Sequence, residues 1–122
     1  MRRLNGPRAY AAVFAYKCAV TGTMFQLHAR PNAMLQARLG IVISKRVLDK
    51  AVARNYCKRL MREVFRAASS SLSGADIVAR PRQAVTRVNA AAARAELSGL
   101  LREACRRCGR LKQAHIASPV RS

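Results

Sequence analysis

The chain has 122 residues, a length that suits a single domain. Its 24 lysines and arginines against 5 aspartates and glutamates give a net charge of +19, while hydrophobic residues make up 51% of the chain, too many for a disordered polycation. A folded body with this charge repels itself unless a polyanion neutralises it, so nucleic acid is the first partner to expect and an anionic membrane the second.

Acid–base chemistry has few candidate residues in this chain. It contains only two histidines, and its five acids are well separated in the sequence. Of the basic residues, 19 are arginine, whose planar guanidinium suits bidentate contacts to phosphate and stacking on bases. The composition therefore favours a nucleic-acid-binding protein over a free-standing enzyme.

No stretch approaches the ~20 apolar residues that a membrane span requires. Arg2 and Arg3 precede an apolar run at 9–16, and the first 48 residues lack acids, which superficially suits a transit peptide. Because the run is short and no clear cleavage pattern follows, we favour an amphipathic first helix that stays in the mature protein. We expect a cytoplasmic location.

The four cysteines are not expected to form a disulfide framework, because no secretion signal accompanies them, and those of the last helix are expected to be ordinary thiols. Cys105 and Cys108, with His115 downstream, resemble half of a zinc site. A structural zinc needs a second pair of ligands, and Cys18 or Cys57 could supply it only through a chance of the fold. We therefore predict no metal site.

The first half of the chain predicts a helix followed by two strands. Pro7 suits a first helical position, and apolar residues then recur at i, i+3 and i+4. The alternating residues at 24–29 predict a half-buried strand. The β-branched run at 38–44 predicts a second strand, dense enough in apolar residues to lie centrally in a sheet. A further short strand near 19–23 stays open.

The second half of the chain predicts a helix at 50–68, a short strand at 76–80 and an alanine-rich helix at 90–107. The order α-β-β-α-β-α predicts an α+β fold, a two-layer sandwich built around a mixed sheet. No linker is long enough to divide the chain. We therefore expect one domain over residues 1–111 and a basic tail at 112–122.

The predicted helix at 50–68 has two faces of opposite character. At about 100° per residue, its polar residues occupy an arc of roughly 140°. They are Arg54, Asn55, Lys58, Arg59, Arg62 and Arg66. A solvated face normally mixes signs, and like charges at i, i+4 oppose helix formation by ~0.2–0.5 kcal/mol per pair. We therefore predict that this arc contacts phosphate, with little reading of base sequence.

The segment from Arg54 to Glu63 reads Arg-Asn-x-x-Lys-Arg-x-x-Arg-Glu and resembles the signature helix of the bacterial ribonuclease P protein subunit. The preceding segment at 40–46, Gly-Ile-Val-Ile-Ser-Lys-Arg, is similar to that family's strand ending in Ser-Lys-Lys/Arg. The resemblance spans roughly residues 3–110. One departure is Tyr56, where many members carry another arginine directly after the asparagine.

The resemblance implies that the chain is the small subunit of a ribonucleoprotein that removes the 5′ leader from precursor transfer RNA. A large catalytic RNA would perform this hydrolysis and hold the Mg²⁺ ions, so the protein would have no catalytic residue and no activity alone. The implied partners are that RNA and precursor transfer RNA, without a membrane or an obligate protein partner. The family fold also implies a left-handed β-α-β crossover around the signature helix.

The resemblance places the RNA-binding residues on the signature helix and at the end of the preceding strand. They are Lys45, Arg46, Arg54, Asn55, Lys58, Arg59, Arg62 and Arg66. A cleft between the first helix and the sheet grips the single-stranded leader in this family. Its aromatic positions correspond to Tyr10, Phe14 and Phe25, with His28 where another ring is common. These rings could stack on bases or belong to the core, and the sequence leaves both open.

Two other functions stay compatible with the residues. A ribosomal protein could use the same basic helix to bind ribosomal RNA, and copurified RNA would distinguish the two. A DNA-binding protein could place residues 54–66 in a major groove, but the sequence offers no recognisable helix-turn-helix partner and no dimer element.

Overall fold

The computed structural model describes residues 3–72 and 74–108, and the predicted basic tail at 112–122 lies outside them. The elements, in chain order, are α1 (Pro7–Tyr16), β1 (Ala19–Thr21), β2 (Phe25–Pro31), β3 (Arg38–Ile41), α2 (Ala51–Ala68), a 3₁₀ turn (Ser69–Ser71), β4 (Ala75–Pro81) and α3 (Ala90–Cys108). The predicted α+β class and element order are confirmed, and the open short strand near 19–23 is present as β1.

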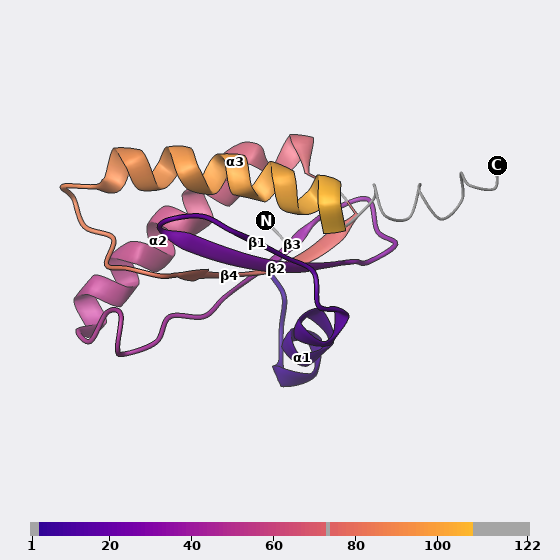
Figure 1. The fold of residues 1–122 in the computed structure, drawn as a ribbon, viewed down its shortest axis with the longest axis horizontal. Coiled ribbons are helices and arrows are strands. Elements are labelled where there is room, and N and C mark those ends of the chain that lie inside the picture. Colours follow the sequence, from indigo (N-terminus) through magenta and orange to yellow (C-terminus); the bar gives the residue numbers. More distant parts are fainter. Residues whose placement is uncertain (1–2, 73, 109–122) are drawn as a thin grey trace.

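The four strands form one mixed sheet in the order β1-β2-β4-β3. Strand β2 pairs antiparallel with both β1 and β4, whereas β3 and β4 are parallel neighbours connected by α2. Helices α2 and α3 cover one face of the sheet and α1 lies on the other (Figure 1). The handedness of the β3-α2-β4 crossover stays a prediction.

Strand β3 lies at the edge of the sheet, so the prediction of a central strand is wrong. The run at 38–44 is apolar because both of its faces are covered. Leu39 packs into the core beneath α2 and α3, while Val42 packs against the smaller cluster under α1. Its outer side meets the N-terminal segment, where the Leu4 N–H donates to the Leu39 carbonyl at 2.9 Å. Because both faces of this edge strand are buried, its sequence is as apolar as that of a central strand.

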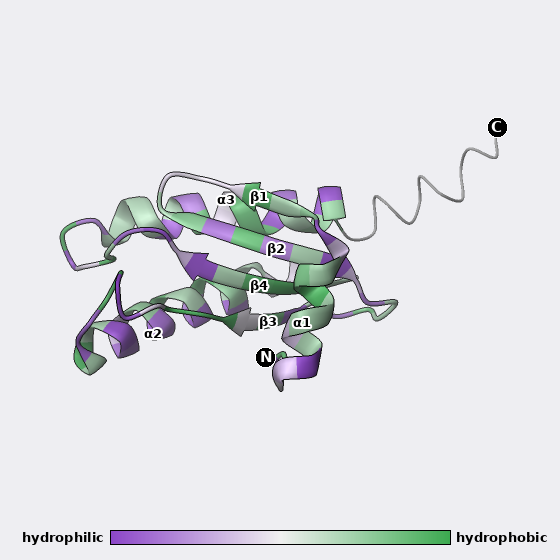
Figure 2. Ribbon diagram, turned by 60° about the horizontal axis from the view of Figure 1, so that its bottom comes forward, coloured by the Kyte–Doolittle hydropathy of each residue, from purple (hydrophilic) through white to green (hydrophobic). Residues whose placement is uncertain are grey.

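The alternation of each strand divides its side chains between two apolar clusters. Leu27 of β2 and Ile77 of β4 face α2 and α3 in the main core. Val78 faces the opposite way and packs with Leu4 and Val13 beneath α1. Strand β4, green over most of its length in Figure 2, lies between β2 and β3 and contributes to both clusters. Helix α1 is thus fixed on the sheet by a small cluster of its own.

A disulfide joins Cys18, between α1 and β1, to Cys108 in the last turn of α3. The expectations that the cysteines form no disulfide and that Cys108 is an ordinary thiol are therefore wrong, and Cys108 cannot be a zinc ligand in this state. The sulfur atoms meet because α3 packs along β1 and ends where the chain enters that strand. Cys57 lies outside the disulfide, and burial raises the pKa of its thiol to about 11.

Asp76 of β4 is the one charged side chain that is fully buried among the described residues. Arg38 donates two hydrogen bonds to its carboxylate, at 2.8 and 2.7 Å, and Asn32 Nδ2 donates a third at 2.8 Å. Burial alone would raise the pKa of Asp76. The hydrogen bonds from Arg38 and Asn32, with the charges of Arg38 and Arg30, outweigh burial and lower this pKa below its usual value. The carboxylate thereby ties β4 to β3 and to the loop that precedes β3.

Replacing Asp76 should destabilise the fold in a pH-dependent way. The pKa is lower in the folded state, so the carboxylate stabilises the fold above about pH 4, and this contribution is lost as the pH falls through the folded pKa. Asp76→Asn should cost roughly 2 kcal/mol at pH 7, and its difference from wild type should shrink toward pH 3. Thermal melts followed by circular dichroism across this range measure both effects.

Glu103→Gln serves as the matched control, because Glu103 forms an exposed pair with Arg107 at 3.4 Å. Its removal should change the stability by less than about 1 kcal/mol. An Asp76→Asn protein that melts like wild type at pH 7 would contradict the structural role of this carboxylate.

Candidate nucleic-acid interface

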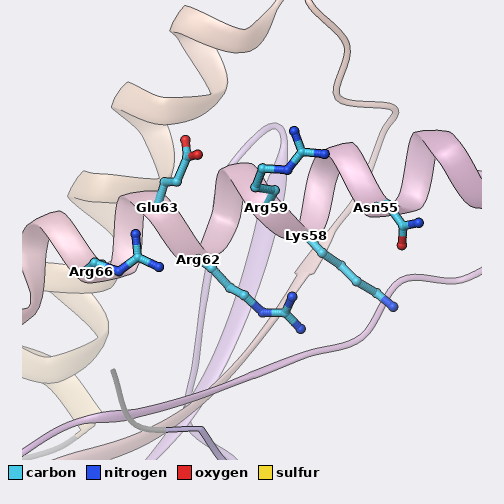
Figure 3. A pocket seen from close by; sticks show the side chains of 6 residues that line it. All are labelled: Asn55, Lys58, Arg59, Arg62, Glu63 and Arg66. Carbon is cyan, nitrogen blue, oxygen red and sulfur yellow. The ribbon is translucent and has the colours of Figure 1, made fainter.

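Helix α2 presents a continuous cationic ridge, and its two-faced character is confirmed. Its buried residues are Cys57, Leu60, Met61, Val64, Phe65 and Ala68. A shallow hollow follows the ridge and is lined by Asn55, Lys58, Arg59, Arg62, Glu63 and Arg66 (Figure 3). Lys58 and Arg62 point to one side of the helix, whereas Arg59 and Glu63 point toward α3. Each predicted α2 residue except Arg54 therefore lies in this hollow.

The acid on the ridge is neutralised from the neighbouring helix. Arg94 Nη2 of α3 lies 3.0 Å from Glu63 Oε1, and both side chains are substantially exposed. An exposed pair of this kind adds little stability. It cancels the single negative charge within the hollow, however, so the ridge as a whole stays positive.

Arg54 differs from the other α2 cations because its guanidinium is bound to the backbone. Its Nη1 donates to the carbonyls of Leu48 at 3.0 Å and Asp49 at 2.9 Å. These bonds hold the segment before α2, in which Lys45 and Arg46 are exposed. Arg54 therefore positions this segment, in addition to the direct contact predicted for it.

A second concavity connects the ridge of α2 to α1. Its lining residues are Arg3, Leu4, Asn5, Tyr10, Leu39, Ile41, Lys58 and Arg62. The Tyr10 ring lies directly over Gly40 of β3, where an added Cβ would come within 2.6 Å of the ring. Glycine at this position therefore lets the ring rest on the strand. Because Lys58 and Arg62 line both hollows, the cationic surface continues into the cleft beside α1.

Phe14 and His28 form an aromatic pair at the other end of α1. Their ring centroids lie 4.8 Å apart with an interplanar angle of 68°, an edge-to-face contact. Burial and the nearby Arg80 lower the pKa of His28, so the imidazole is neutral at pH 7. Its Nδ1 is buried without a hydrogen-bond partner. Both rings are partly exposed, as a stacking surface requires.

Phe25 does not join these rings, and the prediction that it contacts the leader is wrong. Its side chain is completely buried in the main core, on the sheet face that α2 and α3 cover. Successive residues of a strand point to opposite faces. Because Phe25 and His28 are three residues apart on β2, only one of them can face α1.

Two polar residues that the sequence did not identify, Gln26 and Arg80, lie on the α1 side of the sheet. Arg80 donates from Nε and Nη2 to Gln26 Oε1 at 3.3 and 3.2 Å, and Gln26 Nε2 donates to Thr21 Oγ1 at 3.2 Å. This polar row continues the sheet surface beside His28. Alternation from His28 identifies Gln26, but Arg80 could be added only with the β2–β4 register.

The interface gathers ammonium, guanidinium and amide donors beside aromatic rings, a set that suits phosphates and bases. Within residues 3–72 and 74–108, no three histidines, cysteines or acids lie close enough together to hold a metal ion. In the same part of the chain, no helix is long and apolar enough to cross a membrane.

Comparisons with known proteins agree with this geometry. The family model described as Ribonuclease P matches residues 1–105. Ribonuclease P protein components of Azoarcus sp. (strain BH72) and Chromobacterium violaceum are each 39% identical, covering 78% and 85% of this chain and 79% and 86% of their own length.

Solved structures extend the agreement to the fold. The ribonuclease P protein from Thermotoga maritima superposes with a TM-score of 0.71 at 29% identity, over 84% of this chain and 97% of that one. A Staphylococcus aureus ribonuclease P protein mutant gives 0.74 at 27% identity, over 84% and 86%. The chain therefore belongs to the ribonuclease P protein component family, whose members are subunits of the ribonucleoprotein endoribonuclease that matures the 5′ end of transfer RNA.

Proposed function

We propose that the protein binds the catalytic RNA of ribonuclease P through α2 and the 5′ leader of precursor transfer RNA in the cleft beside α1. The observation that carries this proposal is the continuity of the two hollows, because Lys58 and Arg62 line both. An RNA backbone on α2 and bases against Tyr10 would then share one surface. Family membership supports the proposal over the ribosomal and DNA-binding alternatives.

The donor set indicates how the protein would assist cleavage. Mg²⁺ prefers carboxylate and phosphate oxygens, whereas the hollow on α2 offers cations, an amide and one carboxylate, Glu63, which Arg94 already pairs. The metal would therefore be held by the partner RNA and supply the hydrolytic chemistry there. The protein would neutralise crowded phosphates and so lower the Mg²⁺ concentration that the RNA needs.

Reconstitution tests the proposed function directly. The full chain, mixed with a bacterial ribonuclease P RNA at low Mg²⁺, should accelerate leader removal from precursor transfer RNA, measured on gels. The same protein without RNA should be inactive, because the interface offers no nucleophile–base arrangement. Cleavage by RNA-free protein, or no acceleration at low Mg²⁺, would refute the proposal.

The exposed cations of α2 should contribute mainly to RNA affinity. Lys58→Ala and Arg62→Ala should each flatten the slope of log K against log[salt] by about one unit, since each removes one phosphate contact. Arg54→Ala should also lower the melting temperature, because two backbone carbonyls lose their donor. Filter binding across salt concentrations and thermal melts separate these effects. An unchanged slope in the Lys58→Ala/Arg62→Ala double variant would move the RNA face away from α2.

Truncation of the α1 rings should weaken leader binding selectively. Tyr10→Ala or Phe14→Ala should lower the affinity of the holoenzyme for leader-bearing precursor by roughly 5- to 150-fold, because one stacked base contributes ~1–3 kcal/mol. Mature transfer RNA, which lacks a leader, should bind equally well to wild type and variants. Competition binding with both RNAs measures the difference.

Val13→Ala is the matched core variant, because Val13 lies on the same helix and is completely buried. It should lower the melting temperature without discriminating between the two RNAs. If Tyr10→Ala and Phe14→Ala behave like Val13→Ala, these rings belong to the core and the stacking assignment fails.

A further inference from the structure

A cation from outside the signature helix lies beside the ridge of α2. The guanidinium carbon of Arg87 is 5.4 Å from the centroid of the Tyr56 ring, within the range of a cation–π interaction. Tyr56 belongs to α2, whereas Arg87 belongs to the segment between β4 and α3. A positive charge from another element therefore lies over the neutral ring that the helix carries at this position.

The segment that carries Arg87 is anchored on both sides of it. Val85 is buried in the main core. Asn89 Oδ1 accepts a hydrogen bond from the Thr86 N–H at 2.8 Å, and Asn89 Nδ2 donates to the Ala84 carbonyl at 3.0 Å. Arg87 itself is exposed, and Tyr56 is partly buried. The guanidinium thus extends from a braced turn onto the face of a ring that is itself held by packing.

Arg87 and Arg94 meet α2 at equivalent points. Tyr56 and Glu63 are seven residues apart, two helical turns, and lie along the side of α2 that faces α3. Arg94 is neutralised by Glu63. No carboxylate among the described residues lies within ion-pairing distance of Arg87. A guanidinium on a ring face keeps its in-plane N–H groups available, so Arg87 presents an unneutralised donor beside the ridge.

We propose that Arg87 is a further RNA-contacting residue, and that Tyr56 is the positioning residue that holds its guanidinium toward a phosphate of the RNA bound on α2. The inference rests on the proposed function and extends the RNA surface from α2 to the β4–α3 segment. Arg59 follows Tyr56 by three residues on α2, which places the two on the same side of the helix, and it would contact the neighbouring backbone.

Salt-dependent binding of the full chain to a bacterial ribonuclease P RNA tests the assignment. Arg87→Ala should weaken binding by about 3- to 10-fold at low salt and flatten the salt slope by about one unit. Tyr56→Ala should have the same effect, and the double variant Tyr56→Ala/Arg87→Ala should be no weaker than either single variant. Tyr56→Phe keeps the ring and should preserve the slope.

A rescue variant separates the charge from the fold. Arg87→Ala/Tyr56→Arg places a guanidinium at the same point directly from α2, and it should recover the affinity and slope lost in Arg87→Ala. Arg107→Ala is the matched control, because it also removes one exposed arginine. Arg107 lies near the far end of α3, roughly 25 Å from the start of that helix, so its loss should leave the slope unchanged. Thermal melts identify any variant that loses its fold. If Tyr56→Ala or Arg87→Ala does so, Tyr56→Phe and Arg87→Ala/Tyr56→Arg decide whether the ring and the charge act as proposed.

The outcomes distinguish this inference from the function on which it rests. If Arg62→Ala weakens binding but Arg87→Ala does not, the Arg87 contact is refuted and the α2 interface stands. If Tyr56→Ala weakens binding further in the Arg87→Ala background, the ring contacts RNA itself and its positioning role is refuted. If the wild-type protein does not bind the RNA, the proposed function fails and this inference fails with it.

Discussion

The burial of one face of α2 against α3 and the sheet holds together a row of like charges that would oppose helix formation in isolation. The apolar face buries six side chains, and a large aliphatic or aromatic side chain contributes roughly 1.5–3 kcal/mol when fully buried. Each cationic pair at i, i+4 costs only a few tenths of a kcal/mol. Packing therefore exceeds repulsion by a wide margin, and the ridge keeps its charge without internal compensation. The remaining features of the interface depend on this imbalance.

Three of the five acids of the chain are used in ways that preserve that charge. Asp76 is buried with Arg38, and Glu96 Oε2 accepts hydrogen bonds from the backbone N–H groups of Met24 and Phe25 at 2.8 and 3.0 Å. Glu63 is the only acid in the α2 hollow, and Arg94 neutralises it. These acidic side chains therefore hold elements of the fold together. The surface left for a partner is mostly positive, so the proposed assembly with RNA would relieve a repulsion that folding leaves in place.

Local periodicity explains what could be predicted from the sequence. The 18 residues of α2 span five turns, so its two faces and nearly all of its ridge follow from spacing alone. The wrong prediction for Phe25 also has a local cause. Successive residues of a strand point to opposite faces, so Phe25 and His28, three positions apart, lie on opposite faces of the sheet. The edge position of β3, the Cys18–Cys108 disulfide and the Arg87–Tyr56 contact depend on tertiary placement. Residues 90 positions apart in sequence, such as the two joined cysteines, meet for reasons that no window of the sequence contains.

The placement of Tyr10 links the two halves of the interface physically. Its ring rests on Gly40 of β3, and it shares a concavity with Lys58 and Arg62 of α2. A nucleic acid in that concavity would meet a ring from one side and two cations from the other. Stacking tolerates any base and phosphate contacts carry no sequence information, so this combination would favour a single strand without selecting its base sequence. Affinity would then come from backbone charge and base planes and not from base identity, which is the form of recognition that the proposed leader contact requires.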